Sequence, residues 1–165
     1  MERVSFKHVE DAGCKKELVE GFIRENNGDF NPPFSERGNI GEKADSYTEG
    51  KELVEASKNG ETIAILLFTR GGERGPIEKY CPCLYVNLII VDKGYRNKGV
   101  GSSLYNYLKK KILPKSNYNM IGGRTWSENE ASQSCFKKSG FRKVAEGESS
   151  YNEVYYYIFK SQTSI

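Results

Sequence analysis

The sequence has little of what marks several common classes of protein. It contains one histidine, His8, and four cysteines among its 165 residues. We find no signal-peptide pattern at its beginning, and no apolar run is long enough to span a bilayer. We therefore expect a cytoplasmic protein with free thiols rather than a disulfide framework, and no membrane partner.

Two further absences narrow the choice of partner. The net charge of +3 is too small to favour nucleic acid as the main ligand. The triplet Cys81-Pro82-Cys83 lacks the second pair of ligands that a zinc site needs, so we expect no metal. A chain of this length can bury a substantial core without cross-links, and we expect residues 1–165 to form a single domain.

Hydrophobic periodicity predicts alternating strands and helices, and therefore a mixed α/β, or α+β, fold. The predicted strands are 3–9, 52–57, 61–69, 84–91, 118–126, 141–145 and 153–159, and the predicted helices are 14–25, 100–113 and the segment between Ser127 and Gly140. Asn59-Gly60 between two apolar runs predicts a hairpin. Residues 26–50 contain glycines and prolines that break any period, and we expect an irregular segment there.

The most informative stretch joins the predicted strand 84–91 to the helix that follows it. Gly99 and Gly101 have no Cβ, so the backbone can take positive φ and a ligand can approach it closely. The first N–H groups of a helix lack intrahelical partners and lie at the positive end of its dipole, which suits phosphate. Arg96 and Lys98 add two cations. The expected ligand therefore carries a di- or triphosphate-like anion.

Several ligand classes use such a turn, and two of them do not fit. A P-loop needs Gly-x-x-x-x-Gly-Lys-Ser/Thr, which is absent, and a dinucleotide fingerprint needs a third glycine where Leu104 stands. A glycine turn with a solvated charged face is the simplest alternative. The pattern Arg-x-x-Gly-x-Gly, within Tyr95 to Ser102, resembles the acetyl-CoA signature of the GCN5-related N-acetyltransferase (GNAT) superfamily.

A second motif strengthens this resemblance. Asn129-x-x-Ser132-x-x-x-Phe136-x-x-x-Gly140-Phe141 is similar to the superfamily pattern Asn-x-x-Ala-x-x-x-Tyr-x-x-x-Gly-Phe. The resemblance covers roughly Leu84 to Phe159. It implies a GNAT-like fold, in which a mostly antiparallel central sheet of about six or seven strands is flanked by helices.

The resemblance also implies a cofactor site and a reaction. The backbone of the strand end would pair with the pantetheine arm, the turn would cradle the pyrophosphate, Asn129 would bind the pantetheine and Phe136 would pack near the sulfur. The residues implied are Ile89, Ile90, Val91, Arg96, Asn97, Lys98, Gly99, Val100, Gly101, Ser102, Asn129 and Phe136. An amine acceptor would attack acetyl-CoA directly, with positioning and an oxyanion donor supplying most of the rate.

The sequence departs from the family at one position that bears on catalysis. Phe136 stands where many members have a tyrosine that protonates the departing thiolate, so we assign no catalytic acid or base. Three functions remain: an acetyl-CoA-dependent N-acetyltransferase, an acyl-CoA-binding or regulatory module that lost the chemistry, and a nucleotide-binding or interaction domain unrelated to CoA. The segment 26–50 is either a loop that closes over the acceptor or a surface connection. The resemblance alone suggests a homodimer.

Overall fold

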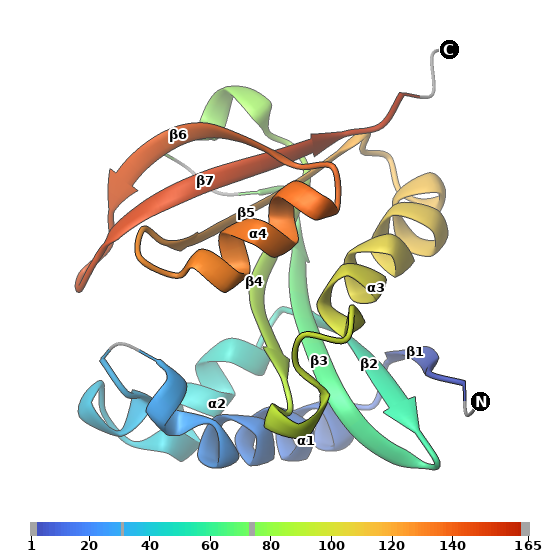
Figure 1. Cartoon of the computed structure of the whole chain (residues 1–165), viewed down its shortest axis with the longest axis vertical. Coiled ribbons are helices and arrows are strands. Elements are labelled where there is room, and N and C mark those ends of the chain that lie inside the picture. Colours follow the sequence, from blue (N-terminus) through green and yellow to red (C-terminus); the bar gives the residue numbers. More distant parts are fainter. Residues whose placement is uncertain (1–2, 31, 73–74, 163–165) are drawn as a thin grey trace. The chain divides into compact units, whose positions relative to one another are not determined.

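The computed structural model describes residues 3–30, 32–72 and 75–162 (Figure 1). The strands are β1 (Ser5–Val9), β2 (Glu52–Lys58), β3 (Glu61–Arg70), β4 (Leu84–Val91), β5 (Met120–Trp126), β6 (Arg142–Glu148) and β7 (Glu153–Lys160). The α-helices are α1 (Ala12–Glu25), α2 (Ile40–Thr48), α3 (Val100–Tyr107) and α4 (Glu130–Lys138). A π-helical turn, η5 (Leu108–Ile112), extends α3, and the 3-10 turns are η1 (Asn27–Asp29), η2 (Phe34–Glu36), η3 (Glu78–Tyr80), η4 (Lys93–Tyr95) and η6 (Leu113–Lys115).

The strands of the described residues form one seven-stranded sheet in the order β1-β2-β3-β4-β5-β7-β6. The pairs β1–β2, β2–β3, β5–β7 and β6–β7 are antiparallel, and β4 pairs with β5 in parallel. The expected α+β fold with a mostly antiparallel sheet is confirmed. The predicted hairpin is also present, because Asn59 (φ 55°) and Gly60 (φ 76°) both take the left-handed backbone that this tight turn requires.

The chain divides into two compact units, which are described in turn. The first comprises Met1–Phe68 and Leu88–Gly101, and the second comprises Thr69–Asn87 and Ser102–Ile165. Strands β3 and β4 therefore contribute to both units. That residues 1–165 act as a single domain stays a prediction.

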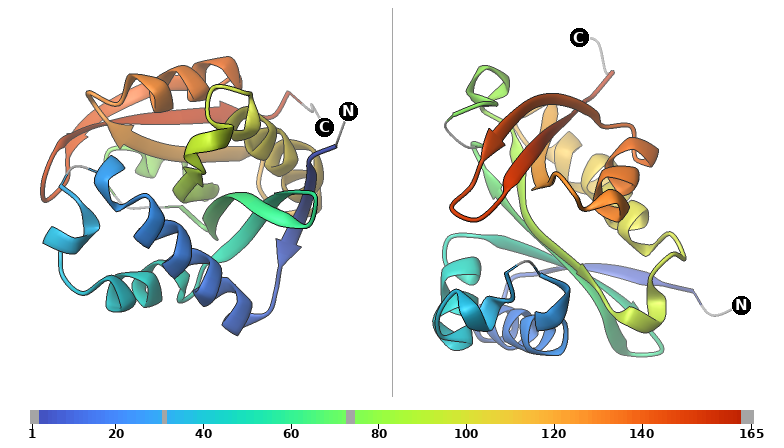
Figure 2. Two further views of the ribbon diagram at one scale, coloured as in Figure 1. Left: turned by 60° about the horizontal axis from the view of Figure 1, so that its bottom comes forward. Right: turned by 60° about the vertical axis from the view of Figure 1, so that its left-hand side comes forward.

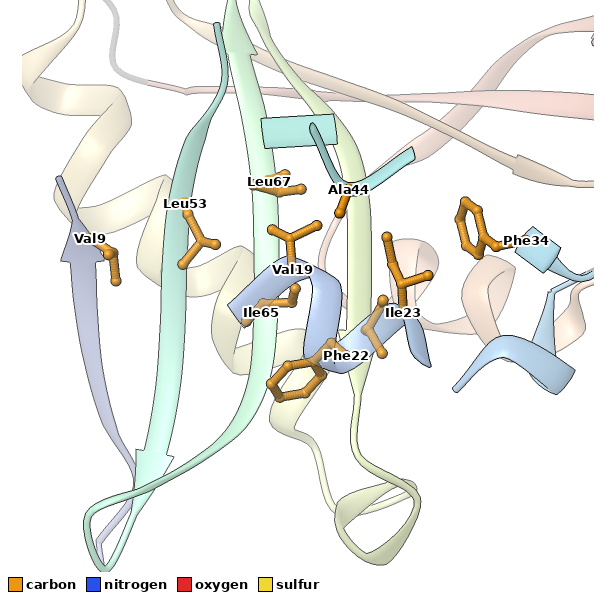
Figure 3. Packing of buried hydrophobic residues seen from close by; sticks show 10 residues of the cluster. Val9, Val19, Phe22, Ile23, Phe34, Ala44, Leu53, Ile65 and Leu67 are labelled. Atoms are coloured by element: carbon orange, nitrogen blue, oxygen red, sulfur yellow. The ribbon is translucent and has the colours of Figure 1, made fainter. Parts of the chain in front are cut away.

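In the first unit, α1 packs its apolar stripe onto β2 and β3. Figure 3 shows Val19, Phe22 and Ile23 of α1 among the side chains that the strands contribute. Burying a side chain of this size contributes roughly 1.5–3 kcal/mol. The buried members of this cluster are Val9, Val19, Phe22, Ile23, Phe34, Ala44, Leu53, Ile65, Leu67 and Ile90. The second half of β4 is thus packed into the core of the first unit by the side chain of Ile90.

Helix α2 lies inside the segment that we expected to be irregular, and the expectation is wrong for Ile40–Thr48. Asn39 caps this helix, with its Oδ1 accepting a hydrogen bond from the Glu42 N–H at 3.1 Å. Ala44 and Thr48 are buried. Gly41 lowers helix propensity by about 1 kcal/mol relative to alanine, so capping and tertiary packing outweigh the local signal.

In the second unit, α4 lies along the face of β5 and β7 (Figure 2). Its Phe136 meets β5 at Gly123, where an added Cβ would come within 3.0 Å of the Phe136 Cζ. Only glycine lets the ring approach the strand this closely. Helix α4 ends at Lys138 with Ser139 as its C-cap, and the predicted glycine, Gly140, follows with positive φ (85°), while the Phe141 N–H donates to the Phe136 carbonyl at 3.0 Å.

Candidate functional site

The turn after β4 has the backbone shape that its sequence predicts. β4 ends at Val91, η4 follows, and α3 begins at Val100. Gly99 takes positive φ (82°), and Asn97 does as well (61°), which asparagine tolerates better than most residues. A Cβ added at Gly99 would meet no heavy atom within 4 Å, apart from those of the two adjoining residues. The space beside the Gly99 backbone is therefore open to a ligand.

The β4 strand changes its surroundings along its length. Its ladder with β5 consists of Leu84↔Ile121, Tyr85↔Gly122 and Val86↔Gly123, all in the second unit. Residues 88–91, which belong to the first unit, take no part in that ladder. Ile90 is buried, whereas Ile89 and Val91 are half-buried. These are the residues whose backbone was predicted to pair with a pantetheine arm.

The two cations of the turn have different surroundings. The Arg96 guanidinium donates from Nε to the Val91 carbonyl at 2.8 Å, and from Nη2 to Asn26 Oδ1 at 2.8 Å and Asp29 Oδ2 at 3.0 Å. Lys98 donates from Nζ to the Gly94 carbonyl at 3.1 Å. Arg96 is thus engaged by protein oxygens, including a carboxylate. No local sequence pattern predicts these partners, because Asn26 and Asp29 lie about 70 residues earlier in the chain.

Asn129, the first residue of the second motif, is the N-cap of α4. Its Oδ1 accepts a hydrogen bond from the Ser132 N–H at 3.1 Å. Ser127, followed three residues later by Glu130, matches the capping-box pattern and predicts the N-cap at Ser127, and that prediction is wrong. Ser127 lies before the helix, and its carbonyl accepts a hydrogen bond from Gln133 Nε2 at 2.7 Å. Asparagine and serine cap equally well, so propensity alone could not choose between them.

Phe136, which stands where the family often has a tyrosine, is a core residue in this structure, with 2% of its surface exposed. Its ring is stacked on Tyr157, with the centroids 4.7 Å apart and the planes 6° from parallel. Tyr105 and Phe141 complete the cluster. The part of the second motif that includes Phe136 therefore builds the interior of the second unit.

Cys135, the neighbour of Phe136 in sequence, contacts the start of α3. Its Sγ lies 3.7 Å from Ser102 Oγ. Burial raises the pKa of the Cys135 thiol, which keeps it protonated near neutral pH. A protonated, half-buried thiol is a poor nucleophile, as expected for a residue of the helix core.

The structure brings the predicted site residues together in two groups. Ile89–Val91 and the turn through Gly101 lie in the first unit, and Ser102, Asn129 and Phe136 lie in the second. Within residues 3–30, 32–72 and 75–162, no three His, Cys, Asp or Glu side chains are placed to hold a metal ion. In the same part of the chain, no helix combines the length and hydrophobicity that a membrane span needs.

Solved structures of acetyltransferases share this fold. The ribosomal-protein-S18-alanine N-acetyltransferase of Escherichia coli has 13% identity and a TM-score of 0.69, over 98% of this chain and 97% of that one. The aminoglycoside acetyltransferase AAC(6')-Ib, solved with coenzyme A, has 15% identity and a TM-score of 0.75, over 97% and 96%. Arabidopsis thaliana NAA60, solved with a bisubstrate analogue, has 16% identity and a TM-score of 0.72, over 98% and 100%.

A search of the curated proteins by sequence found no match. At the identities above, the solved structures establish the fold and leave the substrate open. The sequence model described as "Acetyltransferase (GNAT) family" matches residues 15–141, which is well over half of the chain. The match spans α1 through α4 and includes both motifs. The chain therefore belongs to the acetyltransferase (GNAT) family.

Proposed function

We propose that this protein is an N-acetyltransferase that transfers the acetyl group of acetyl-CoA to a primary amine of a small molecule or a peptide. Family membership supports acetyl transfer. The single observation that carries the proposal is the open space beside Gly99, where the backbone has positive φ and α3 begins at the next residue. A pyrophosphate binds readily at a helix N-terminus whose backbone it can approach closely.

The proposed cofactor site follows the chain from β4 into α3. The backbone of Ile89 to Val91, which lies outside the β4–β5 ladder, would pair with the pantetheine arm. The turn from Arg96 to Ser102 would hold the pyrophosphate through backbone N–H groups, with Lys98 supplying positive charge. The absence of a side chain at Gly99 suits acetyl-CoA, because a side chain there would occupy the open space that the pyrophosphate would use.

Asn129 and Phe136 have different parts in this proposal. The Asn129 Oδ1 is occupied by the helix cap, so its Nδ2 is the group that would donate to a pantetheine carbonyl. Phe136 would act through its shape, by fixing α4 against β5 at Gly123.

The proposed reaction is a direct attack in a ternary complex. A neutral amine would form the new C–N bond at the thioester carbonyl, the C–S bond would break, CoA would leave as a thiolate, and the amine nitrogen would lose its proton to solvent. A backbone N–H of the β4 end would stabilise the developing oxyanion. Phe136 cannot protonate the thiolate, but a thiol with a pKa near 8.5 leaves acceptably without a proton.

The second candidate is a module that binds acyl-CoA and catalyses acetyl transfer weakly or not at all. The observation that favours it is the missing hydroxyl at position 136. Both candidates would bind the cofactor through the same proposed residues and differ only in turnover. We also propose a cytoplasmic protein that acts on neither nucleic acid nor membrane, and we keep a homodimer as a suggestion from the family resemblance.

Two experiments test this function. Thermal unfolding is measured with acetyl-CoA, CoA, ATP and NAD, and we expect stabilisation by both CoA species alone. Release of free thiol is then followed with a panel of small amines and peptide N-termini, against a reaction without acceptor. Acceptor-dependent release supports the transferase. CoA binding without release supports the weak module, and absence of CoA binding rejects both.

A further inference from the structure

Arg96 uses three N–H donors to join three separate parts of the first unit. Its Nε bonds the carbonyl of Val91, the last residue of β4. Its Nη2 bonds Asn26, which follows α1, and Asp29 of η1. Asp29 also has Lys93 Nζ at 4.0 Å from its Oδ2. These hydrogen bonds connect the start of the turn to the residues that follow α1.

Both polar atoms of the Asn26 side chain take part in hydrogen bonds of this link. It is 2% exposed, and its Nδ2 donates to the Phe22 carbonyl at 2.8 Å while its Oδ1 accepts from Arg96. Loss of the guanidinium would leave a buried amide oxygen without its donor, which is unfavourable. The Asp29 N–H in turn donates to the Asn26 carbonyl at 3.0 Å. The contact is therefore a network with paired groups, and not a chance surface bridge.

We propose that Arg96 is a positioning residue of the pyrophosphate turn, and that Asn26 and Asp29 are the residues that hold it in place. This inference rests on the proposed function of the same turn. The Arg96 charge is balanced by the Asp29 carboxylate, so the cofactor phosphates are bound by the turn backbone and Lys98. Arg96 acts on them indirectly, by fixing the path of the chain between Val91 and Asn97.

The alternative is that Arg96 leaves Asp29 and binds the phosphates itself, and two substitutions separate the two roles. Lysine keeps the charge but cannot reproduce the fork of donors. For Arg96→Lys, positioning predicts a Kd for acetyl-CoA raised about tenfold, roughly the loss of one charge-assisted hydrogen bond. Direct binding predicts a nearly unchanged Kd.

For Asp29→Asn, the two roles of Arg96 predict changes in acetyl-CoA affinity of opposite sign. Under direct binding, removal of the competing carboxylate frees Arg96 and tightens acetyl-CoA binding. Under positioning, the turn loses an anchor and binding weakens. Removing the negative charge of Asp29 also strengthens the long-range attraction of the turn for the anionic cofactor. The ratio of the variant Kd to the wild-type Kd is therefore measured at about 1 M salt, where the Debye length is about 3 Å. Tighter binding there would overturn the inference.

Hydrogen exchange of the amides of residues 97–101, measured without cofactor, provides a readout that does not depend on binding. Positioning predicts faster exchange in Arg96→Lys and Asp29→Asn, at temperatures where both variants remain folded. Arg24→Ala is the matched control, because it removes an arginine ion pair with Glu20 on α1 of the same unit and should leave these amides unchanged. Unchanged exchange in both turn variants would overturn the link. If the wild type failed to bind acetyl-CoA, the proposed function would fail, and the exchange data would still decide the role of Arg96.

Discussion

The Phe136 ring lies face to face with the Tyr157 ring, with 4.7 Å between the centroids. On β5, Gly123 faces the Cζ atom of the same phenylalanine and pairs in register with Tyr157. The residue that departs from the family motif is therefore enclosed between an aromatic ring and a strand whose missing side chain makes room for it. This packing determines how the substitution Phe136→Tyr would affect stability.

We expect Phe136→Tyr to destabilise the protein by about 1–3 kcal/mol, the usual range for overpacking a core. The new hydroxyl would be added at Cζ, the atom closest to Gly123, in a site with almost no solvent. Urea unfolding measures the loss, and Phe159→Tyr is the control because Phe159 is only half-buried on β7. A variant as stable as the wild type, with faster turnover, would show that the position tolerates the acid that the family uses.

Gly99→Ala should weaken acetyl-CoA binding by more than its effect on folding explains. Gly99 has φ of 82°, and alanine there is strained by about 1–2 kcal/mol. Gly60→Ala, in the β2–β3 hairpin, carries the same strain (φ 76°) and likewise meets no atom within 4 Å. The two variants should lose similar stability in urea, whereas calorimetric titration should show weaker binding for Gly99→Ala alone. If Gly99→Ala and Gly60→Ala bound acetyl-CoA with equal Kd values, no phosphate would approach Gly99.

Local sequence signals predicted those parts of the fold whose conformation is decided by neighbouring residues. Asn59-Gly60 predicted its hairpin and Gly140 its helix end, because positive φ at these positions depends on residue type more than on distant contacts. The inner row of the helix after the turn, Leu104 and Leu108, is buried as its spacing predicts. Strong periodicity and turn chemistry were sufficient for these elements.

The misses occurred where tertiary contacts decide the structure. Helix α2 has few residues and contains Gly41, so its formation depends on the burial of Ala44 rather than on propensity. The partners of Arg96 come from another part of the chain, and a single sequence has no periodicity that connects them. That Phe136 packs near the cofactor sulfur stays a prediction, and no local signal could show how deeply its ring is buried.

Alkaline pH should destabilise the protein through Cys83. Burial, together with the Cys81 thiol 3.9 Å away, raises the pKa of Cys83 to about 12. Below a pH of about 8.5, the thiol is protonated in both states and the stabilisation is fully present. As the pH rises towards 12, the unfolded chain ionises first, so the free energy of unfolding falls by at most about 1.4 kcal/mol per pH unit.

Urea unfolding of the wild type and of Cys83→Ala, at about pH 8 and about pH 10, isolates this contribution. The alanine variant should lose less stability between the two conditions. Cys14→Ala removes an exposed thiol and should keep the wild-type dependence. An equal pH dependence in all three proteins would assign the alkaline loss to other groups.

Asn129→Asp should separate the capping role of this residue from its proposed contact with the cofactor. Aspartate caps a helix as well as asparagine does, and its charge suits the helix N-terminus, so the Ser132 N–H keeps its acceptor and stability should hold. The substitution removes the Nδ2 donor, and we expect the Kd for acetyl-CoA to rise by about three- to tenfold, roughly one hydrogen bond. Asn39→Asp is the matched control, because Asn39 caps α2 through the same kind of bond to Glu42. If both variants bound acetyl-CoA as tightly as the wild type, Asn129 would be a helix cap alone, and the contact between the second motif and the pantetheine would have to be abandoned.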